Sequence, residues 1–401
     1  MGVADDRLPW SEKDLQQWDL LTRFRQRLLN PAAPVALHGS WKDPERRLLY
    51  ADYLSLFLFG LLNPVVKTLR ALCSASQLAR VRREVCSQSV SLGSFSEAQH
   101  LVEPAALEQL FGDLSAQVPG PPAGEPRAAW QQWFARDSSL FAALPRMSWA
   151  LYGGGRAGAK NNAVRLHLSL HLLDDKPARA QITVGKTCER QAWKADWRKG
   201  DAFVGDRYFA EDYRLLGQLD EHGCRYVLRL RDEAVIRVQE ELSVSPADSG
   251  AAVTRQGWVR LGARAAGQSP RVRVVWVRTA AGETLRLVTN VGPEALSAAE
   301  IGLLYRRRWQ IECFFRWIKC LLGCRHWLAE SQRGVTLQLY LALIAAVLLQ
   351  LATGQRPNRR MLELIQMHQL GWASVEELLA GLGREVARVK RTQSKAAARK
   401  D

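Results

Sequence analysis

The sequence lacks the cysteine patterns that would cross-link a small fold or bind zinc. Its seven cysteines are an odd number, and no two of them form a CxxC pair. Cys320, Cys324 and His326 lie close together, but their spacing fits no common set of zinc ligands. We therefore expect free thiols in a reducing cytosol rather than a disulfide framework or a structural zinc.

A targeting sequence and a clear membrane span are also missing. The first residues, MGVADDRLPWSEKD, contain no basic region followed by an apolar one, so we expect no signal peptide. The most apolar run, residues 335–352, is interrupted by Thr336, Gln338, Tyr340 and Gln350. These polar residues favour a buried core helix over a membrane-spanning one.

Acidic residues are scarce relative to basic ones. The chain has 40 Asp and Glu against 56 Lys and Arg, which is a formal net charge of +16 with His neutral. On a globular chain of 401 residues, this excess points to a polyanionic partner such as nucleic acid. A basic protein without such a partner is the alternative. The length suits two or three domains.

Composition divides the chain into regions of different texture. Residues 1–117 have mainly helical patterns, and the Pro- and Gly-rich segment 118–127, VPGPPAGEPR, is typical of a linker. Residues 128–231 and 297–355 combine strand and helix patterns, which predicts a mixed α/β domain. The segment between them, 232–296, has four strand-like runs separated by turns, and we interpret it as an all-β insertion.

The C-terminal part has two further patterns. Residues 356–382 are expected to form helices. Residues 383–401 contain seven Lys or Arg against two acidic residues and almost no apolar content. We expect a basic, disordered and solvated tail, with non-specific DNA contact as the alternative.

The stretch from Leu304 to Gly323, LYRRRWQIECFFRWIKCLLG, predicts an apolar helix with one polar edge. Tyr305, Arg308, Glu312 and Lys319 fall within about 60° of one helical face. A carboxylate flanked by cations suggests metal and phosphate chemistry. The alternative is a simple i, i+4 ion pair of Arg308 with Glu312, and spacing alone favours it.

Two aspartates are candidates for the same chemistry, because two-metal phosphoryl transfer needs carboxylates that converge from different elements. Asp206 ends the short apolar strand of AFVGD, and a strand end projects its side chains beyond the sheet edge. Asp137 follows a short apolar stretch in WFARDSSLF. Turn-forming or helix-capping roles are open alternatives for both. Asp174 and Asp175 rank lower because they lie in a predicted hairpin turn.

The spacing Tyr305-x2-Arg308-x3-Glu312-x6-Lys319 resembles, without a gap, the Y-R-E-K signature of bacterial insertion-sequence DDE transposases of the Insertion Sequence Four family. The residues between and beside these positions, in the stretch YRRRWQIE, also resemble those of the family. The match has four fixed positions plus context, so chance explains it poorly.

Two further motifs extend this resemblance. GDRYF is similar to the family's second-aspartate motif and assigns that role to Asp206. RDSSLFAALPRMSWALY resembles the stretch that begins with the first aspartate, which would be Asp137. Ser138 stands where the family usually has glycine. The similarity covers roughly residues 130–350.

The resemblance implies a fold and a set of site residues. The fold is α/β, with an RNase H-like catalytic domain in residues 128–231 and 297–355, a β-rich insertion at 232–296 and C-terminal helices. The N-terminal helical domain, residues 1–117, would serve DNA binding and assembly. The implied catalytic and metal-binding residues are Asp137, Asp206 and Glu312, which would hold two Mg²⁺ ions, with Mn²⁺ as a substitute. The implied DNA- or phosphate-binding residues are Tyr305, Arg308 and Lys319.

The implied function is a DNA transposase that cleaves at insertion-sequence ends and transfers strands into target DNA. Its partners would be double-stranded DNA and a second copy of the chain on DNA, and its location cytoplasmic and nucleoid-associated. A metal-dependent DNA nuclease on the same scaffold and a catalytically silent DNA-binding derivative are the alternatives. Hairpin-forming relatives carry a Trp on the inserted segment, but TLRLVTN has none and Trp276 is on the preceding strand, so the hairpin pathway is left open.

Overall fold

The computed structural model describes residues 19–29, 41, 47–119, 132–154, 160–262, 269–322 and 327–398. The predicted linker falls outside these ranges apart from its first two residues. The chain divides into two compact units, each built from several segments. One comprises residues 1–119, 141–164 and 316–401, and the other residues 120–140 and 165–315. Strands β1 and β3 and helix α12 run from one unit into the other.

The first unit is mostly helical. Its helices are α2 (Asp19–Leu28), α3 (Tyr50–Leu62), α4 (Leu69–Ala75), α5 (Ala79–Glu84), α6 (Leu92–Ala98), α7 (Pro104–Gln117), α13 (Gln332–Thr353), α14 (Arg359–Gln369) and α15 (Val375–Ala398). The helical character expected for the N-terminal region is thus present. Thr68 caps the start of α4, where its side chain accepts a hydrogen bond from the Ala71 amide.

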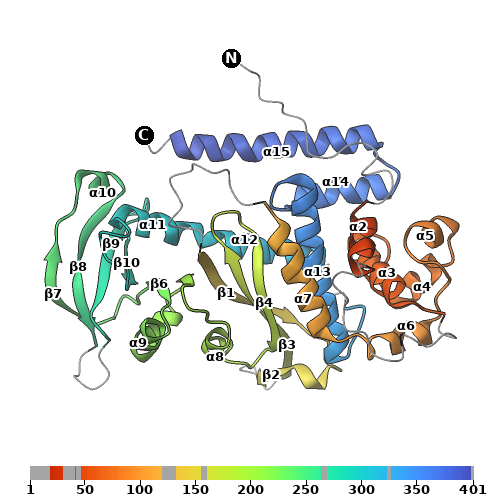
Figure 1. The fold of residues 1–401 in the computed structure, drawn as a ribbon, viewed down its shortest axis with the longest axis horizontal. Helices are drawn as coiled ribbons and strands as arrows, with labels where there is room; N and C mark the ends of the chain where they lie inside the picture. Colours follow the sequence, from red (N-terminus) through yellow and green to blue (C-terminus); the bar gives the residue numbers. More distant parts are fainter. Residues whose placement is uncertain are drawn as a thin grey trace, which may run out of the picture. The chain divides into compact units, whose positions relative to one another are not determined.

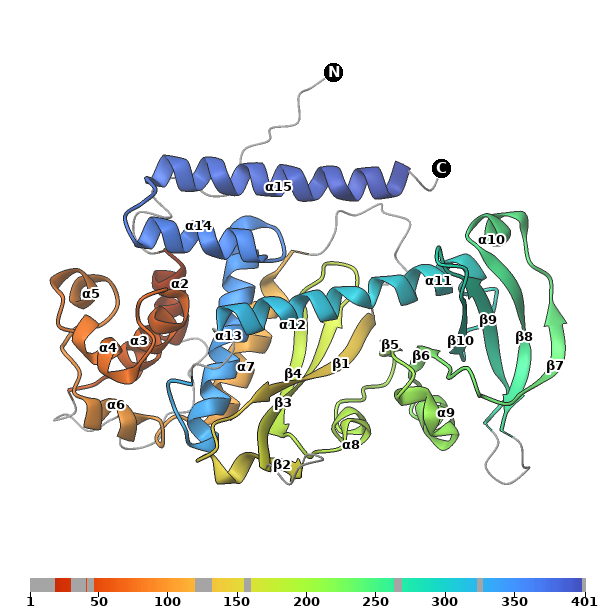
Figure 2. The same ribbon diagram turned by 180° about the vertical axis from the view of Figure 1, so that it is seen from behind.

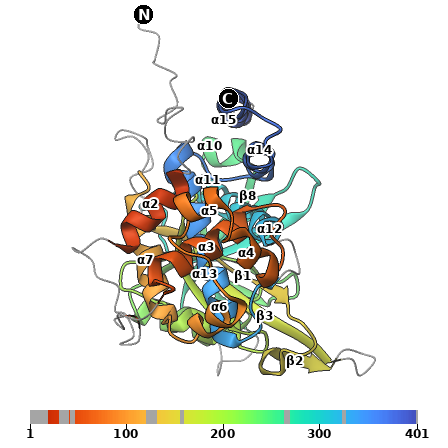
Figure 3. The same cartoon turned by 90° about the vertical axis from the view of Figure 1, so that its right-hand side faces the viewer.

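Helix α13 is the core of this unit, where it packs against α7 and α3 (Figures 1 and 3). Among the described residues it is the one helix long and apolar enough to cross a membrane, but 83% of its most apolar window is buried inside the protein. Gln338, fully buried, accepts a hydrogen bond from the Leu328 amide at 2.9 Å. These facts support the core helix expected from the sequence. Gly354 ends the helix in a left-handed conformation that glycine adopts readily.

The expectation of a disordered basic tail at residues 383–401 is wrong as far as Ala398, because α15 continues to that residue. Leu378, Leu382 and Val386 recur every four residues and are buried, so they form an apolar stripe that carries the helix into the basic segment. Glu385, one of the two acidic residues of this segment, pairs with Arg388 one turn later.

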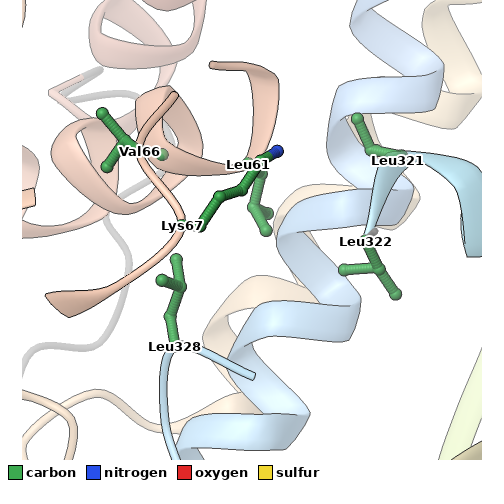
Figure 4. A pocket seen from close by; sticks show the side chains of 7 residues that line it. Leu61, Val66, Lys67, Leu321, Leu322 and Leu328 are labelled. Carbon is green, nitrogen blue, oxygen red and sulfur yellow. The ribbon is translucent and has the colours of Figure 1, made fainter. Parts of the chain in front are cut away.

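A small pocket lies within the first unit (Figure 4), and its volume of about 10 Å³ is near the minimum for one water molecule. The Lys67 ammonium borders it and lies 3.4 Å from the Asn63 carbonyl oxygen. Burial lowers the pKa of Lys67. The pocket is a small imperfection of core packing, too small for a ligand. It is lined by Gly60, Leu61, Val66, Lys67, Leu321, Leu322 and Leu328.

The sheet is mixed and mostly antiparallel. It has ten strands in the order β2-β3-β1-β5-β6-β10-β9-β8-β7, with β4 paired to β3. The strands are β1 (Trp133–Ala142), β2 (Leu151–Gly154), β3 (Lys160–His171), β4 (Pro177–Val184), β5 (Ala202–Gly205), β6 (Arg225–Arg229), β7 (Ile236–Leu242), β8 (Val253–Leu261), β9 (Val272–Arg278) and β10 (Thr284–Thr289). A mixed α/β architecture was predicted, and it is observed.

Three neighbouring strands of the second unit, β1, β5 and β6, run parallel. Such strands need crossover connections, and two helices supply them: α8 (Glu189–Lys194) precedes β5 and α9 (Tyr213–Glu221) precedes β6 (Figure 2). Trp193 of α8 is fully buried against Phe203 of β5 and Phe209. This aromatic cluster fixes α8 against the strand that ends at Asp206.

The segment 232–296 continues the main sheet. Its last strand, β10, pairs antiparallel with β6, and β9, β8 and β7 follow in order (Figure 1). The segment also contains the short helix α10 (Pro246–Gly250), so it is β-rich but not purely β. Proline and a Ser245 capping box start this helix, a signal that the strand patterns on either side obscured.

The helix predicted for residues 304–323 is two helices in line (Figure 2). Helix α11 (Ala298–Arg307) and helix α12 (Trp309–Leu321) meet at Arg308. A capping box of Ser297 and Glu300 starts α11 earlier than the apolar pattern indicated. Arg308 keeps helical backbone angles, with φ −50° and ψ −33°, so the polar edge stays aligned across the break.

Two glycine substitutions should have opposite effects on stability. In Gly257→Ala the new Cβ would lie 2.7 Å from the Glu240 carbonyl oxygen, so the β7–β8 pairing must shift. In Gly112→Ala, within helix α7, the new Cβ meets nothing within 4 Å. We expect a loss of about 1–3 kcal/mol for the first and a gain of about 0.5–1 kcal/mol for the second. Thermal unfolding of both variants measures this, and a Gly257→Ala variant as stable as wild type would contradict the close β7–β8 approach.

Candidate active site

The pairing of β1 with β5 brings the two candidate aspartates together. Ala135 pairs with Val204 in parallel register, so the same register continued for two residues sets Asp137 level with Asp206. Side chains two residues beyond an aligned pair project to the same face of the sheet. Asp137 therefore lies within strand β1, not at the end of an apolar stretch as the sequence suggested, while Asp206 directly follows β5 as predicted.

Arg308 joins the third carboxylate to the first. Its Nη1 lies 3.4 Å from Asp137 Oδ2 and its Nη2 lies 2.5 Å from Glu312 Oε1. The ion pair of Arg308 with Glu312 that spacing alone favoured is therefore present. The contact with Asp137, 171 residues away, means that Arg308 joins two carboxylates from distant parts of the chain. Arg308 Nε is buried and makes no hydrogen bond within the part of the chain that the structure describes.

Asp137 is a carboxyl group in an environment poor in compensating charge. Its side chain is 20% exposed, and desolvation raises its pKa from 3.8 to about 7. The negative charges of Asp206 and Glu189 act in the same direction. The Ser138 amide, which donates to Asp137 Oδ1 at 2.7 Å, and the Arg308 guanidinium oppose the shift. Burial thus disfavours the charged form of Asp137 more than its hydrogen bond and the Arg308 charge favour it.

Asp206 is held by the turn that follows it. The Tyr208 amide donates to Asp206 Oδ1 at 3.0 Å, an Asx-type turn of the kind weighed as an alternative for this residue. The two readings are compatible, because the turn uses one oxygen and leaves the other. Gly205 precedes it, and a Cβ there would lie 2.9 Å from both Leu228 and Phe209. Close packing therefore demands glycine at the strand end.

Two other residues of the signature lie on the same helices. The Tyr305 ring is 5.7 Å from Arg308 Cζ, so it lies beside the cluster on α11. Lys319 stands two turns beyond Glu312 on α12, with Nζ 5.5 Å from the Phe141 ring centroid. The structure thus brings Asp137, Asp206, Glu312, Arg308 and Tyr305 together, and Lys319 lies beside the Phe141 ring.

The lower-ranked aspartates of the hairpin turn are engaged elsewhere. Asp174 accepts a hydrogen bond from His171 Nδ1 at 2.6 Å and pairs with Lys176 at 3.1 Å. Asp175 adopts a positive φ of 54° and lies 3.6 Å from Arg307. These contacts give both aspartates structural roles in the β3–β4 turn.

The residues at the cluster fit a divalent cation in part. Asp137 and Asp206 offer carboxylate oxygens, the donors that Mg²⁺ prefers. Glu312, however, is turned to Arg308. Across the described ranges, no three His, Cys, Asp or Glu side chains are close enough to hold a metal ion as they stand.

Sequence reasoning missed three residues near the aspartates, namely Arg165, Glu189 and Arg190. Arg165 on β3 donates to Ser138 Oγ at 2.9 Å and pairs with Glu189. Arg190 donates to the Tyr208 carbonyl oxygen and pairs with Glu211. No spacing rule links β3 or the start of α8 to the aspartates. An arginine within a strand pattern and a charged pair opening a helix were the only local signals.

Fold and site together define a class, an α/β protein with one aspartate on a parallel strand, a second directly after the neighbouring strand and a glutamate on a later helix. Residues 120–348 match the family model for the transposase DDE domain. Since the match spans more than half of the chain, the protein belongs to this family, as the sequence motifs predicted.

Two relatives carry the same assignment. A Geobacillus stearothermophilus protein named as the transposase for insertion sequence element IS5377 is 30% identical over 204 residues, 51% of this chain and 52% of the relative. The match therefore spans about half the length of that relative. A Sinorhizobium fredii protein, y4zB, also named as a transposase, is 27% identical over 270 residues, 66% of this chain and 72% of the relative.

A solved structure, the piggyBac transposase synaptic complex with hairpin DNA, aligns over 92% of this chain and 79% of its own. The sequence identity is 10% and the TM-score 0.41. A TM-score below 0.5 does not establish a shared fold.

The raised pKa of Asp137 predicts how the metal-free protein responds to pH. The folded state binds this proton more tightly than the unfolded state, so stability falls as pH rises from about 4 to about 7. Asp137→Asn removes the ionising group. We expect equal melting temperatures for variant and wild type at pH 4.5 and a variant more stable by a few degrees at pH 8, both in a chelator. Unfolding curves at the two pH values measure this, and a variant less stable at pH 8 would contradict the raised pKa of the largely buried Asp137.

Proposed function

We propose that this protein is a DNA transposase that cleaves the ends of its own insertion sequence and joins them to target DNA. The observation that supports it most directly is the parallel register of β1 with β5, which sets Asp137 level with Asp206. Membership of the DDE family and the +16 net charge support DNA as substrate. The RNase H-like fold of the catalytic domain belongs to the same proposal, together with its expected boundaries at residues 128–231 and 297–355.

Asp137, Asp206 and Glu312 are proposed as the carboxylates that hold two divalent cations, with Mg²⁺ the physiological ion and Mn²⁺ a substitute. When bound, the ions would supply Lewis-acid polarisation of the scissile phosphate. Asp137 binds as the carboxylate, so it loses its proton when a cation is held. Glu312 would hold a cation with the carboxylate that is now paired with Arg308. The chain's own part is to fix these oxygens on two strands and one helix.

Arg308, Tyr305 and Lys319 are proposed to bind the DNA backbone. With Glu312 holding a cation, the Arg308 guanidinium would offer Nη2 to a phosphate oxygen, and its buried Nε is a further donor. The Tyr305 hydroxyl can donate to a phosphate beside it. Lys319 would act as a point charge further along the same helix edge.

The reaction needs two DNA ends, so we propose that two copies of the chain assemble on DNA. The N-terminal helices, residues 1–117, are proposed to serve DNA binding and assembly. A cytoplasmic, nucleoid-associated location fits that partner.

Removing a carboxylate should separate chemistry from binding. We expect Asp206→Ala and Glu312→Ala each to lower the rate of end cleavage about 10³-fold or more, because several kcal/mol of transition-state stabilisation are lost. DNA affinity at fixed salt should change little. Cleavage and strand-transfer assays with Mg²⁺ or Mn²⁺, on DNA that carries the inverted repeats flanking the coding region, measure both effects.

Glu330→Gln is the matched control, because Glu330 is an exposed glutamate paired with Arg146 as Glu312 is with Arg308. It should cleave as wild type does. Cleavage without joining would favour a nuclease, and salt-sensitive binding without cleavage a DNA-binding derivative. Full activity of Asp137→Ala would show that the first carboxylate is another residue.

A further inference from the structure

The first turn of helix α8 lies between the two catalytic aspartates and is connected to each of them. Glu189, the first residue of α8, is paired with Arg165 of β3, and Arg190 reaches the turn after β5. The negative charge of Glu189 contributes to the raised pKa of Asp137 and to that of Tyr208, so Glu189 lies near both residues.

On the Asp137 side, Arg165 makes three contacts that fix one position. It donates to Ser138 Oγ at 2.9 Å through Nη1, to the Gly185 carbonyl oxygen at 3.1 Å through Nε, and pairs with Glu189. Its side chain is only 11% exposed. Ser138 in turn donates its amide to Asp137 Oδ1 at 2.7 Å. The guanidinium therefore holds the residue that orients the Asp137 carboxylate.

On the Asp206 side, Arg190 has the same relation to the turn. Its Nε donates to the Tyr208 carbonyl oxygen at 3.1 Å, and its Cζ lies 4.1 Å from the Tyr208 ring centroid. Its Nη2 lies 2.8 Å from Glu211. The Tyr208 amide donates to Asp206 Oδ1. Arg190 thus immobilises the residue that orients the second carboxylate.

We propose that Arg165 and Arg190 are positioning residues that set the orientation and separation of the Asp137 and Asp206 carboxylates for cation binding. The proposal rests on the function proposed above. It also accounts for Ser138, which stands where the family usually has glycine. In this chain the Ser138 hydroxyl accepts the Arg165 hydrogen bond, a contact that glycine could not make.

The physical reason is that carboxylates carrying like charge on adjacent strands repel each other. Their pairing with a cation requires both oxygens to be held before the ion arrives, and groups behind metal ligands commonly contribute 10–100-fold in metal affinity. A lysine at either position keeps the charge but loses the planar fork that makes several fixed hydrogen bonds at once. Arg→Lys therefore tests geometry separately from charge.

The test is Mn²⁺ binding to the full chain without DNA, followed by the paramagnetic resonance signal of free Mn²⁺. Wild type should bind Mn²⁺ in a way that Asp206→Asn abolishes. Arg165→Lys and Arg190→Lys should each raise the Mn²⁺ Kd about tenfold or more. Arg255→Lys is the matched control, because Arg255 likewise pairs with a glutamate, Glu241, and lies 4.9 Å from an aromatic ring, that of Trp276. Its Kd should not change.

Thermal unfolding in a chelator distinguishes positioning from general stability. Arg165 is 11% exposed and Arg255 48%, so Arg165→Lys should lower the melting temperature more, but both arginine variants should be fully folded at the temperature at which their raised Kd is measured. If both variants bind Mn²⁺ as wild type does, this inference fails and the proposed function stands. If wild type shows no Mn²⁺ binding that depends on Asp206, the proposed metal chemistry fails and this inference with it.

The route through Ser138 can be tested by a double-mutant cycle. Ser138→Ala should raise the Mn²⁺ Kd on its own and add little in the Arg165→Lys background, because both changes remove the same hydrogen bond between Arg165 and Ser138. Fully additive effects would overturn the Arg165 half of the proposal. The Arg190 half is tested independently by its own variant.

Discussion

The parallel pairing of β1 with β5 is the constraint on which the site depends. A shift of one residue would turn Asp137 to the other face of the sheet, since neighbouring strand residues point to opposite sides. The register is held by burial: Trp133, Phe203 and Val204 are essentially inaccessible to solvent, and a slip would expose them. The apolar core of the second unit therefore determines the distance between the two carboxylates.

Charge at the site follows from this constraint. The register places Asp137 in a largely buried position, and desolvation raises its pKa, with a smaller contribution in the same direction from the negative charge of Asp206. Arg308 partly neutralises the negative charge of the site, because it forms ion pairs with both Asp137 and Glu312. One guanidinium shared by two carboxylates leaves the cluster negative, which is the condition under which a divalent cation binds. The same arginine is then available to a phosphate.

The sequence allowed a large part of this to be predicted, because several elements have strong local patterns. Apolar and polar residues alternate within β3 and β4, an apolar run precedes Asp206, and the helix has a polar edge, so each of these elements could be predicted. The Y-R-E-K spacing then indicated the family. Asp137 was harder to place, because the middle of its strand reads RDSS and lacks the apolar residues typical of a buried strand. The prediction of a disordered tail failed because it relied on charge and overlooked the four-residue recurrence of Leu378, Leu382 and Val386.

What remained hidden were contacts between side chains distant in sequence. Arg165 and Glu189 are 24 residues apart, and Arg190 and Tyr208 are 18 apart. A motif records residues whose spacing the backbone fixes, such as i, i+3 and i+7 on a helix. The residues behind the carboxylates obey no such spacing, because a long arginine side chain can reach the same hydroxyl or carbonyl from several backbone positions. Sequence patterns therefore reveal the groups that touch the reacting atoms more readily than those that orient them. Substitutions such as Ser138 for glycine, next to a motif residue, mark where such an orienting contact has been added.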